Sequence, residues 1–118
     1  MEWIINGSGF TQHFGYQKPL VLIINKGSRS AKEVLAFILK KSKRAVLVGE
    51  ATGGNVLGTS PLMLGDWAVV EIPMVDLEVD DVRLEGKGVE PDFYVVGKPT
   101  ADRDPFIERA IEVLNMAR

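Results

Sequence analysis

A run of five consecutive aliphatic residues, 20–24, limits what this chain can fold into more than any other feature of its sequence. An unbroken run of β-branched and leucine residues this short is typical of a strand buried on both faces, as in a parallel sheet. Residues 31–39 repeat apolar side chains at helical spacing and lead into a basic run, 40–44, which suits a helix C-terminus. Residues 45–48 form a second apolar run. Together these segments predict a right-handed βαβ unit with a parallel strand pair.

The second half of the chain has a different pattern, in which short apolar segments are separated by Gly-Asp, Pro and Asp-Asp turns. This pattern predicts short strands at 56–60, 67–73, 75–79, 82–84 and 92–96. A final helix is expected to begin with Asp104 as its N-cap residue and Pro105 at its first helical position. The residues expected on its inner face are Ile107, Ala110, Ile111 and Leu114. The predicted class is therefore α/β, with an antiparallel extension after the βαβ unit.

Length and composition favour one domain without a cofactor or metal. The 118 residues suffice for one core, so residues 1–118 are expected to form a single domain with a lead-in loop at 1–18. With no cysteine and one histidine, the chain has no disulfide and no multi-histidine metal site. A net charge of −2 attracts no nucleic acid, and the longest apolar run, the six residues 34–39, is too short to span a membrane. The first residues carry no secretory leader, so we expect a cytoplasmic chain. If the chain is part of a longer protein that is exported, which we call the parent, an extracytoplasmic location is expected instead.

The turn between the first strand and the first helix is where we expect chemistry. A serine at a sharp strand-to-helix turn presents its hydroxyl at the carboxyl edge of the sheet. There the helix N-terminus offers amide donors and a positive potential to a developing oxyanion. Ser28 and Ser30 both lie in this turn. The alternative is that one of them only caps the helix, with Glu33 completing a capping box from Ser30, and caps are the commoner use of such serines.

Four blocks of sequence, in order, carry a resemblance to a known family. They lie at 18–33, 44–54, 84–92 and 104–114, and the first includes Ser28-Arg29-Ser30-Ala31-Lys32-Glu33. Over residues 18–115 the chain resembles the C-terminal part of the catalytic domain of the C-terminal processing (tail-specific) serine peptidases. Four ordered blocks are far more specific than a single motif. The resemblance implies a crotonase-like (Clp-protease-like) α/β fold.

The resemblance also implies roles for three residues. Ser30 corresponds to the nucleophile, and the Ala31 amide to one arm of the oxyanion hole. Glu85 corresponds to a glutamate that orients a histidine base and stabilises its imidazolium form. The alternative for Glu85 is a surface carboxylate beside a glycine turn. Tail-specific members use a lysine base, but Asn55 stands at that position here, which places the chain with the tricorn-like branch that takes a histidine from an upstream segment.

The upstream half of the family's catalytic domain, with its histidine and second oxyanion amide, is missing from this chain. His13 is the single histidine, and it lies where the family has none, so we do not expect it to be the base. The sequence thus predicts a serine-type endopeptidase domain, incomplete by itself, that acts on peptide or protein substrates. Its expected partners are the missing N-terminal half and, in a homo-oligomer, a second copy. The alternative is an inactive, truncated domain used for binding or assembly.

Overall fold

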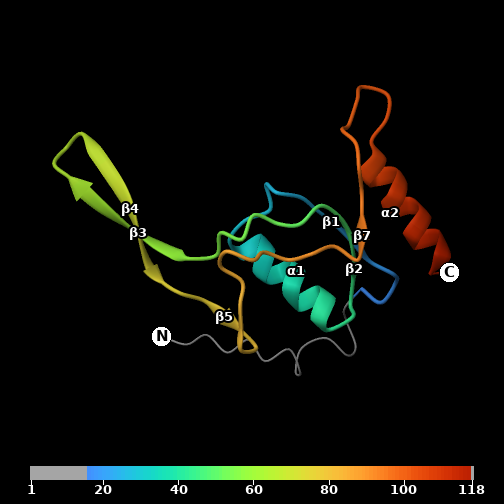
Figure 1. Cartoon of the computed structure of the whole chain (residues 1–118), viewed down its shortest axis with the longest axis horizontal. Coiled ribbons are helices and arrows are strands. Elements are labelled where there is room, and N and C mark those ends of the chain that lie inside the picture. Colours follow the sequence, from blue (N-terminus) through green and yellow to red (C-terminus); the bar gives the residue numbers. More distant parts are fainter. Residues whose placement is uncertain (1–15, 118) are drawn as a thin grey trace.

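A three-stranded parallel sheet organises the computed structural model, which describes residues 16–117. Its strands are β1 (Val21–Ile24), β2 (Val46–Gly49) and β7 (Phe93–Tyr94), in the order β1-β2-β7. The central strand β2 pairs in parallel with both neighbours. Because β1 and β2 are joined through helix α1, the predicted βαβ unit with its parallel pair is confirmed (Figure 1).

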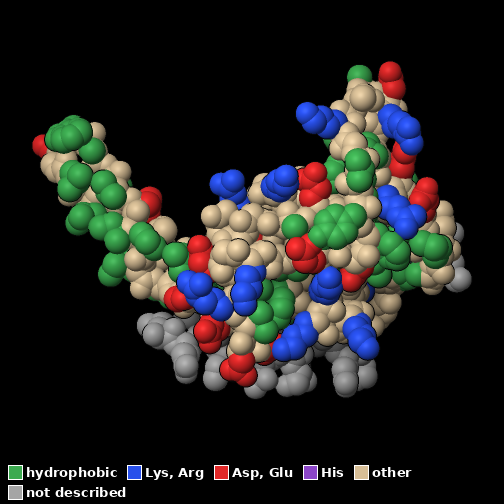
Figure 2. All heavy atoms as spheres, viewed as in Figure 1, with side chains coloured by type: hydrophobic (Ala, Val, Ile, Leu, Met, Phe, Trp, Pro, Cys, Tyr) green, Lys and Arg blue, Asp and Glu red, His purple; other side chains and the backbone are tan. Residues whose placement is uncertain are grey.

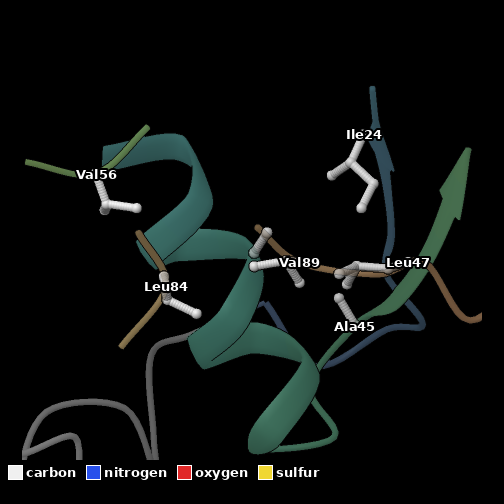
Figure 3. Close-up of a cluster of buried hydrophobic side chains, with 7 residues drawn as sticks. Ile24, Ala45, Leu47, Val56, Leu84 and Val89 are labelled. Atoms are coloured by element: carbon white, nitrogen blue, oxygen red, sulfur yellow. The ribbon is translucent and has the colours of Figure 1, made fainter. Parts of the chain in front are cut away.

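Two helices cover opposite faces of this sheet because successive side chains of β2 point in opposite directions. Leu47 lies in one core cluster with Ala36 of α1 (Ala31–Lys41). Val48 lies in a second cluster with Val113 of α2 (Pro105–Met116). Figure 3 shows the first cluster, in which the side chains labelled beside α1 are Ile24, Ala45, Leu47, Val56, Leu84 and Val89. The result is an α/β fold with the sheet between its two helices.

A long antiparallel hairpin extends away from the sheet (Figure 1). It consists of β3 (Gly58–Leu64) and β4 (Ala68–Val75), and a shorter hairpin of β5 (Glu78–Val79) and β6 (Val82–Arg83) follows it. Every residue of β3 is exposed, and only two positions of β4 are partly buried. The antiparallel strands therefore lie outside the parallel core, as predicted.

Two predictions about the strands are wrong. β1 is not buried on both faces: it is an edge strand of the sheet, and Ile23 remains 40% exposed. The expected strands 56–60 and 75–79 also have other bounds, since β3 continues through Pro61 to Leu64 and β4 ends at Val75. A proline is tolerated there because each strand of a two-stranded hairpin is an edge strand, and its outward-facing backbone needs no N–H.

The last helix begins as predicted but turns a different face to the sheet. Asp104 is its N-cap residue, and Pro105 is its first residue. The residues buried along α2 are Ala110 and Val113, whereas Ile107 and Ile111 are 51% and 52% exposed. Apolar residues occupy more than one face of this helix, and packing against Val48 and Val95 of the sheet side selects the face that carries Val113.

Residues 1–15 lie outside the described part of the chain. The expectations for His13 and for most of the lead-in loop therefore fall outside it as well. Neither helix within residues 16–117 has the length and apolar character needed to cross a membrane.

Candidate functional site

Ser30 has a strained backbone at the end of the loop that joins β1 to α1. It lies just before α1, with φ 58° and ψ −131°. A non-glycine residue in such a region costs about 1–3 kcal/mol, and such residues concentrate at active sites, ligand clamps and switches. A strained strand-to-helix turn of this kind exposes the nucleophilic serine of α/β-hydrolases. The residue is exposed, so a substrate can reach its hydroxyl.

The N-terminus of α1 lies directly beside this hydroxyl. Ser30 is the N-cap residue and Ala31 is the first helical residue. The Ser30 N–H is already used, because it donates to the Asn55 carbonyl oxygen (2.8 Å) and to Glu33 Oε2 (3.2 Å). As the first residue of a helix, Ala31 has no intrahelical acceptor for its N–H. This amide is therefore positioned as a donor to an oxyanion, at the positive end of the helix dipole.

A fully buried carboxylate, Glu33, ties the turn to the segment after β2. Its exposed fraction is 0%. Its Oε1 accepts hydrogen bonds from Thr52 Oγ1 (2.5 Å) and the Gly54 N–H (2.6 Å). Its Oε2 accepts from the Asn55 N–H (2.8 Å) in addition to the Ser30 N–H. We call Glu33 and residues 52–55 the Glu33 clamp, since together they fix the backbone of Ser30.

The Glu33 carboxylate is charged, and no cationic side chain within residues 16–117 forms an ion pair with it. Burial acts to raise its pKa, but the hydrogen bonds from Thr52, Gly54, Asn55 and Ser30 outweigh burial and hold the pKa below the ordinary value of 4.5. The negative charge also lies in the first turn of α1, where the helix dipole stabilises an anion. At neutral pH the clamp is therefore built on an ionised side chain.

Glu85 lies on the other side of the same segment. Its Oε2 accepts hydrogen bonds from the Val56 N–H (2.6 Å) and the Leu57 N–H (3.1 Å). Asn55 thus stands between stretches of backbone that two carboxylates hold. Its own side chain donates from Nδ2 to the Gly53 carbonyl oxygen (3.2 Å), and the residue is exposed. Glu85 is partly buried and bound to backbone, which differs from the free surface carboxylate that was its alternative.

An apolar groove of about 470 Å³ opens beside Ser30 and Ala31, which both line it. We call it the Ser30 groove. Its other lining residues are Val34, Leu35 and Ile38 of α1, and Val56, Gly58, Val75 and Leu77 across from the helix. No charged side chain lines the groove within the part of the chain that the structure describes.

The side chains of the remaining candidates take no part in the Glu33 clamp or the Ser30 groove. Ser28 Oγ accepts from the Asn25 N–H (3.3 Å), and Ser28 does not cap α1. Lys26, Lys32 and Lys87 are exposed. Over residues 16–117, no three histidine, aspartate or glutamate side chains gather so as to hold a metal ion.

Sequence reasoning missed the role of Glu33 and Thr52. The spacing of Ser30 and Glu33 indicates a capping box, and the structure has one, but it is a small part of what Glu33 contacts. A further signal was present in the chain order: Ser30 follows β1 and Thr52 follows β2. Since the carboxyl ends of parallel strands meet at one edge of the sheet, polar residues after both strands are expected to lie close together.

The fold and the turn together define a class, that of α/β domains with a serine at a strand-to-helix turn. The profile of peptidase family S41 matches residues 6–95. The chain belongs to peptidase family S41, which makes it a serine protease-like domain, and the resemblance to C-terminal processing peptidases is confirmed.

Two curated relatives represent the two branches considered above. The chain is 35% identical over 107 residues to a tricorn protease homolog from Saccharolobus solfataricus, a match that covers 86% of the chain and 10% of the relative. It is 37% identical over 79 residues to a carboxyl-terminal-processing protease from Synechocystis, covering 66% of the chain and 18% of the relative. The chain thus spans less than a fifth of the length of either relative.

Solved structures give the same picture of the fold. The crystal structure of the tricorn protease superposes with a TM-score of 0.75 and 28% identity, covering 85% of this chain and 10% of that one. A photosystem II D1 C-terminal processing protease superposes with a TM-score of 0.59 and 33% identity, covering 81% of this chain and 24% of that one. Both matches support the mixed α/β architecture.

Proposed function

We propose that this chain is the nucleophile-bearing part of a crotonase-like serine endopeptidase domain, with Ser30 as the nucleophile. The observation that carries the proposal is the strained backbone of Ser30, φ 58°, at the N-terminus of α1. A residue that only caps a helix needs no such strain. Asp104 caps α2 of the same chain with φ −124° and an ordinary extended backbone.

In the proposed reaction the Ser30 hydroxyl oxygen attacks the carbonyl carbon of a peptide bond and gives its proton to a base. The negative charge that develops on the carbonyl oxygen is stabilised by the Ala31 N–H and the positive end of the α1 dipole. The C–N bond then breaks as the leaving amine takes up a proton. Water hydrolyses the resulting ester on Ser30 and restores the hydroxyl.

The base in this proposal comes from outside residues 16–117. Asn55, at the position of the family lysine, has no basic group, and Lys26, Lys32 and Lys87 are exposed and lack the burial that activates a lysine. We therefore favour a tricorn-like arrangement in which a histidine is the base and Glu85 orients it. Glu85 is half-buried, and its carboxylate accepts a hydrogen bond from the N–H of Leu57, which lies two residues after Asn55. This position near Asn55 supports the role given to Glu85.

Labelling with a fluorophosphonate tests the proposal directly, because this probe reacts with an activated serine. In the complete parent we expect labelling that Ser30→Ala abolishes and Asn55→Ala leaves intact. Adding the upstream portion of the parent to this chain should increase labelling. A gain of labelling in Asn55→Lys would show that the site descends from the lysine branch and would contradict the role given to Glu85.

The residue at position 55 also favours a second function. Asn55 in place of a lysine, together with the exposed hairpin β3–β4, fits a domain that keeps the fold for binding or assembly and has lost catalysis. A well-folded parent in which Ser30 resists the probe would support this alternative over the first.

A further inference from the structure

Arg29, the residue directly before Ser30, carries a charge that the fold does not use. Its side chain is exposed, and its guanidinium forms no hydrogen bond or ion pair within residues 16–117. Every other arginine in this part of the chain holds a carboxylate or a backbone carbonyl: Arg44, Arg83, Arg103 and Arg109. The unpaired guanidinium therefore lies beside the proposed nucleophile.

The stem of Arg29 lies against Gly53, on the segment that follows β2. A Cβ atom at position 53 would come within 3.0 Å of Arg29 Cγ, 2.9 Å of Asn55 Nδ2 and 3.1 Å of the Lys26 carbonyl oxygen. Gly53 itself is exposed, so the space bounded by these three residues opens to solvent. We call this space the Gly53 cradle.

The Gly53 cradle is fixed next to Ser30 by backbone hydrogen bonds. The Ser30 N–H donates to the Asn55 carbonyl oxygen (2.8 Å), and the Gly53 N–H donates to the Ser28 carbonyl oxygen (3.1 Å). The Cα atoms of consecutive residues are about 3.8 Å apart, so Arg29 is also held close to Ser30. A group that occupies the cradle therefore lies close to a peptide bond held at Ser30.

We propose that the Gly53 cradle binds a carboxylate of the peptide, on a residue near the bond to be cut, with Arg29 and Asn55 as its donors. The inference rests on the proposed function and adds to it a class of substrate. A guanidinium matches the geometry of a carboxylate with two parallel N–H groups. Asn55 Nδ2 uses one N–H on the Gly53 carbonyl oxygen and has a second to offer.

Two features of the surroundings support a peptide carboxylate as the ligand. The carboxylates that reach this segment are already bound by backbone N–H groups, Glu33 by those of Gly54 and Asn55 and Glu85 by that of Val56. They therefore do not occupy Arg29. The Lys26 carbonyl oxygen, on the third side of the cradle, can accept a backbone N–H of the ligand, which favours a peptide over a free anion.

An NMR titration of the 118-residue chain tests the cradle without requiring catalysis. In about 0.15 M salt, where general attraction between exposed charges is screened, we expect N-acetyl-alanyl-glutamyl-alanine amide to bind. It should shift the signals of the Arg29 Nε–H, the Asn55 side-chain amide and the Gly53 N–H. The glutaminyl analogue has the same shape without the charge and should leave them in place.

Three variants separate the cradle from the general charge of the turn. Arg29→Gln should weaken binding of the glutamyl peptide by about tenfold or more, as expected for a lost hydrogen bond to a charged group. Lys32→Gln removes the same charge from an exposed residue of the same turn that is not among the nearest neighbours of position 53, so it should bind nearly as the wild type does. Gly53→Ala should weaken binding without any change of charge, because its Cβ occupies the cradle.

A third peptide identifies the source of the carboxylate. N-acetyl-alanyl-glutaminyl-alanine with a free C-terminus carries its only charge at the chain end. If it moves the same signals as strongly as the glutamyl amide does, the cradle takes a carboxylate from either source. If it leaves them in place, the cradle selects an acidic side chain.

Other results overturn the inference. Equal shifts with the glutaminyl amide, or equal losses in Arg29→Gln and Lys32→Gln, would show that the cradle is not a carboxylate site. Equal affinity for acetate would indicate adventitious anion binding only. A parent whose Ser30 reacts with the fluorophosphonate, in a chain that does not bind the glutamyl peptide, would overturn the cradle alone. Binding of this peptide together with a folded parent whose Ser30 resists the probe would contradict the proposed function and keep the cradle as a binding site.

Discussion

At Ser30, one residue both begins a helix and exposes a hydroxyl, and its backbone conformation is strained. Glycine adopts a φ of 58° without strain and costs only a few tenths of a kcal/mol as an N-cap residue. We therefore expect Ser30→Gly to raise the free energy of unfolding by about 1 kcal/mol. Ser30→Ala keeps the strain, and because the Ser30 side chain makes no cap hydrogen bond it should change this free energy by well under about 1 kcal/mol. Urea denaturation of both variants beside the wild type measures the difference.

The same two variants connect stability with activity. If Ser30 is the nucleophile, both should lower turnover of the complete parent by roughly 10³-fold or more. A variant that is more stable and inactive is what a strained catalytic residue produces. Full activity in a well-folded Ser30→Gly parent would remove Ser30 from the mechanism.

Glu33 should make the stability of the fold depend on pH on the acid side. Its pKa is lowered in the folded chain, so its contribution is complete above the ordinary carboxyl pKa and is lost as the pH falls through the lowered value. Glu33→Gln should cost about 2–4 kcal/mol at neutral pH, because an amide cannot accept hydrogen bonds from all of these donors. Denaturation curves across the acid range should show the gap between wild type and variant narrowing as the pH falls.

Glu112→Gln is the matched control for this substitution. Glu112 is an exposed helix residue whose carboxylate contacts only Arg109 among the partners that the described residues provide (2.8 Å). The same chemical change there should leave stability at neutral pH nearly unchanged. Equal losses in both variants would contradict the special role of the Glu33 clamp.

At the scale of elements, the two helices differ in what their first residues do. The Asp104 carboxylate accepts from the N–H groups of Phe106 (2.9 Å) and Ile107 (3.3 Å), as an ordinary cap does. Asp104→Ala should therefore lower the free energy of unfolding by about 1 kcal/mol. It should leave fluorophosphonate labelling of the parent unchanged, because α2 does not line the Ser30 groove. Loss of labelling in a folded Asp104→Ala parent would show that α2 takes part in the site.

Local patterns predicted the βαβ unit well, because both of its strands and its helix are encoded by spacing within one continuous stretch. The hairpin β3–β4 was predicted too short, since Pro61 and Pro73 read as strand breakers and only the pairing shows that both strands are edges. The buried face of α2 was predicted incorrectly because the sequence of this helix is apolar on more than one side. Tertiary packing, which sequence periodicity does not contain, decided both cases.

At the scale of the whole molecule, the site combines segments that local reasoning treats separately. The turn alone left Ser28 and Ser30 as candidates, and only the family resemblance selected Ser30, which lies at the N-terminus of α1. The Glu33 clamp joins residues 21 and 22 positions apart, and Glu85 binds the backbone just before the hairpin, 29 positions away at Val56. These contacts depend on the parallel arrangement of β1 and β2, so patterns within one segment do not show them.

The chain by itself should show little peptidase activity and should associate with itself. Serine is a poor nucleophile without an adjacent base, and the residues that the structure describes around Ser30 include no buried lysine or histidine. Large apolar side chains are exposed along the hairpin: Leu62, Met63, Leu64, Trp67, Val69, Val70, Met74 and Val75. Figure 2 shows apolar side chains gathered along its projecting strands. Exposed apolar patches of this kind favour association.

Light scattering coupled to size-exclusion chromatography, over a range of protein concentrations, measures this association. We expect the average mass to rise with concentration in the wild type. Combining Leu62→Lys with Trp67→Ser should reduce that rise, because Trp67 is 86% exposed at the end of the hairpin and its loss removes surface without disturbing the core. Leu35→Lys, in the groove, should leave the association as it is. A monomer at every concentration would contradict the role of the hairpin, and peptide hydrolysis that disappears in Ser30→Ala would make His13 the first candidate for the base.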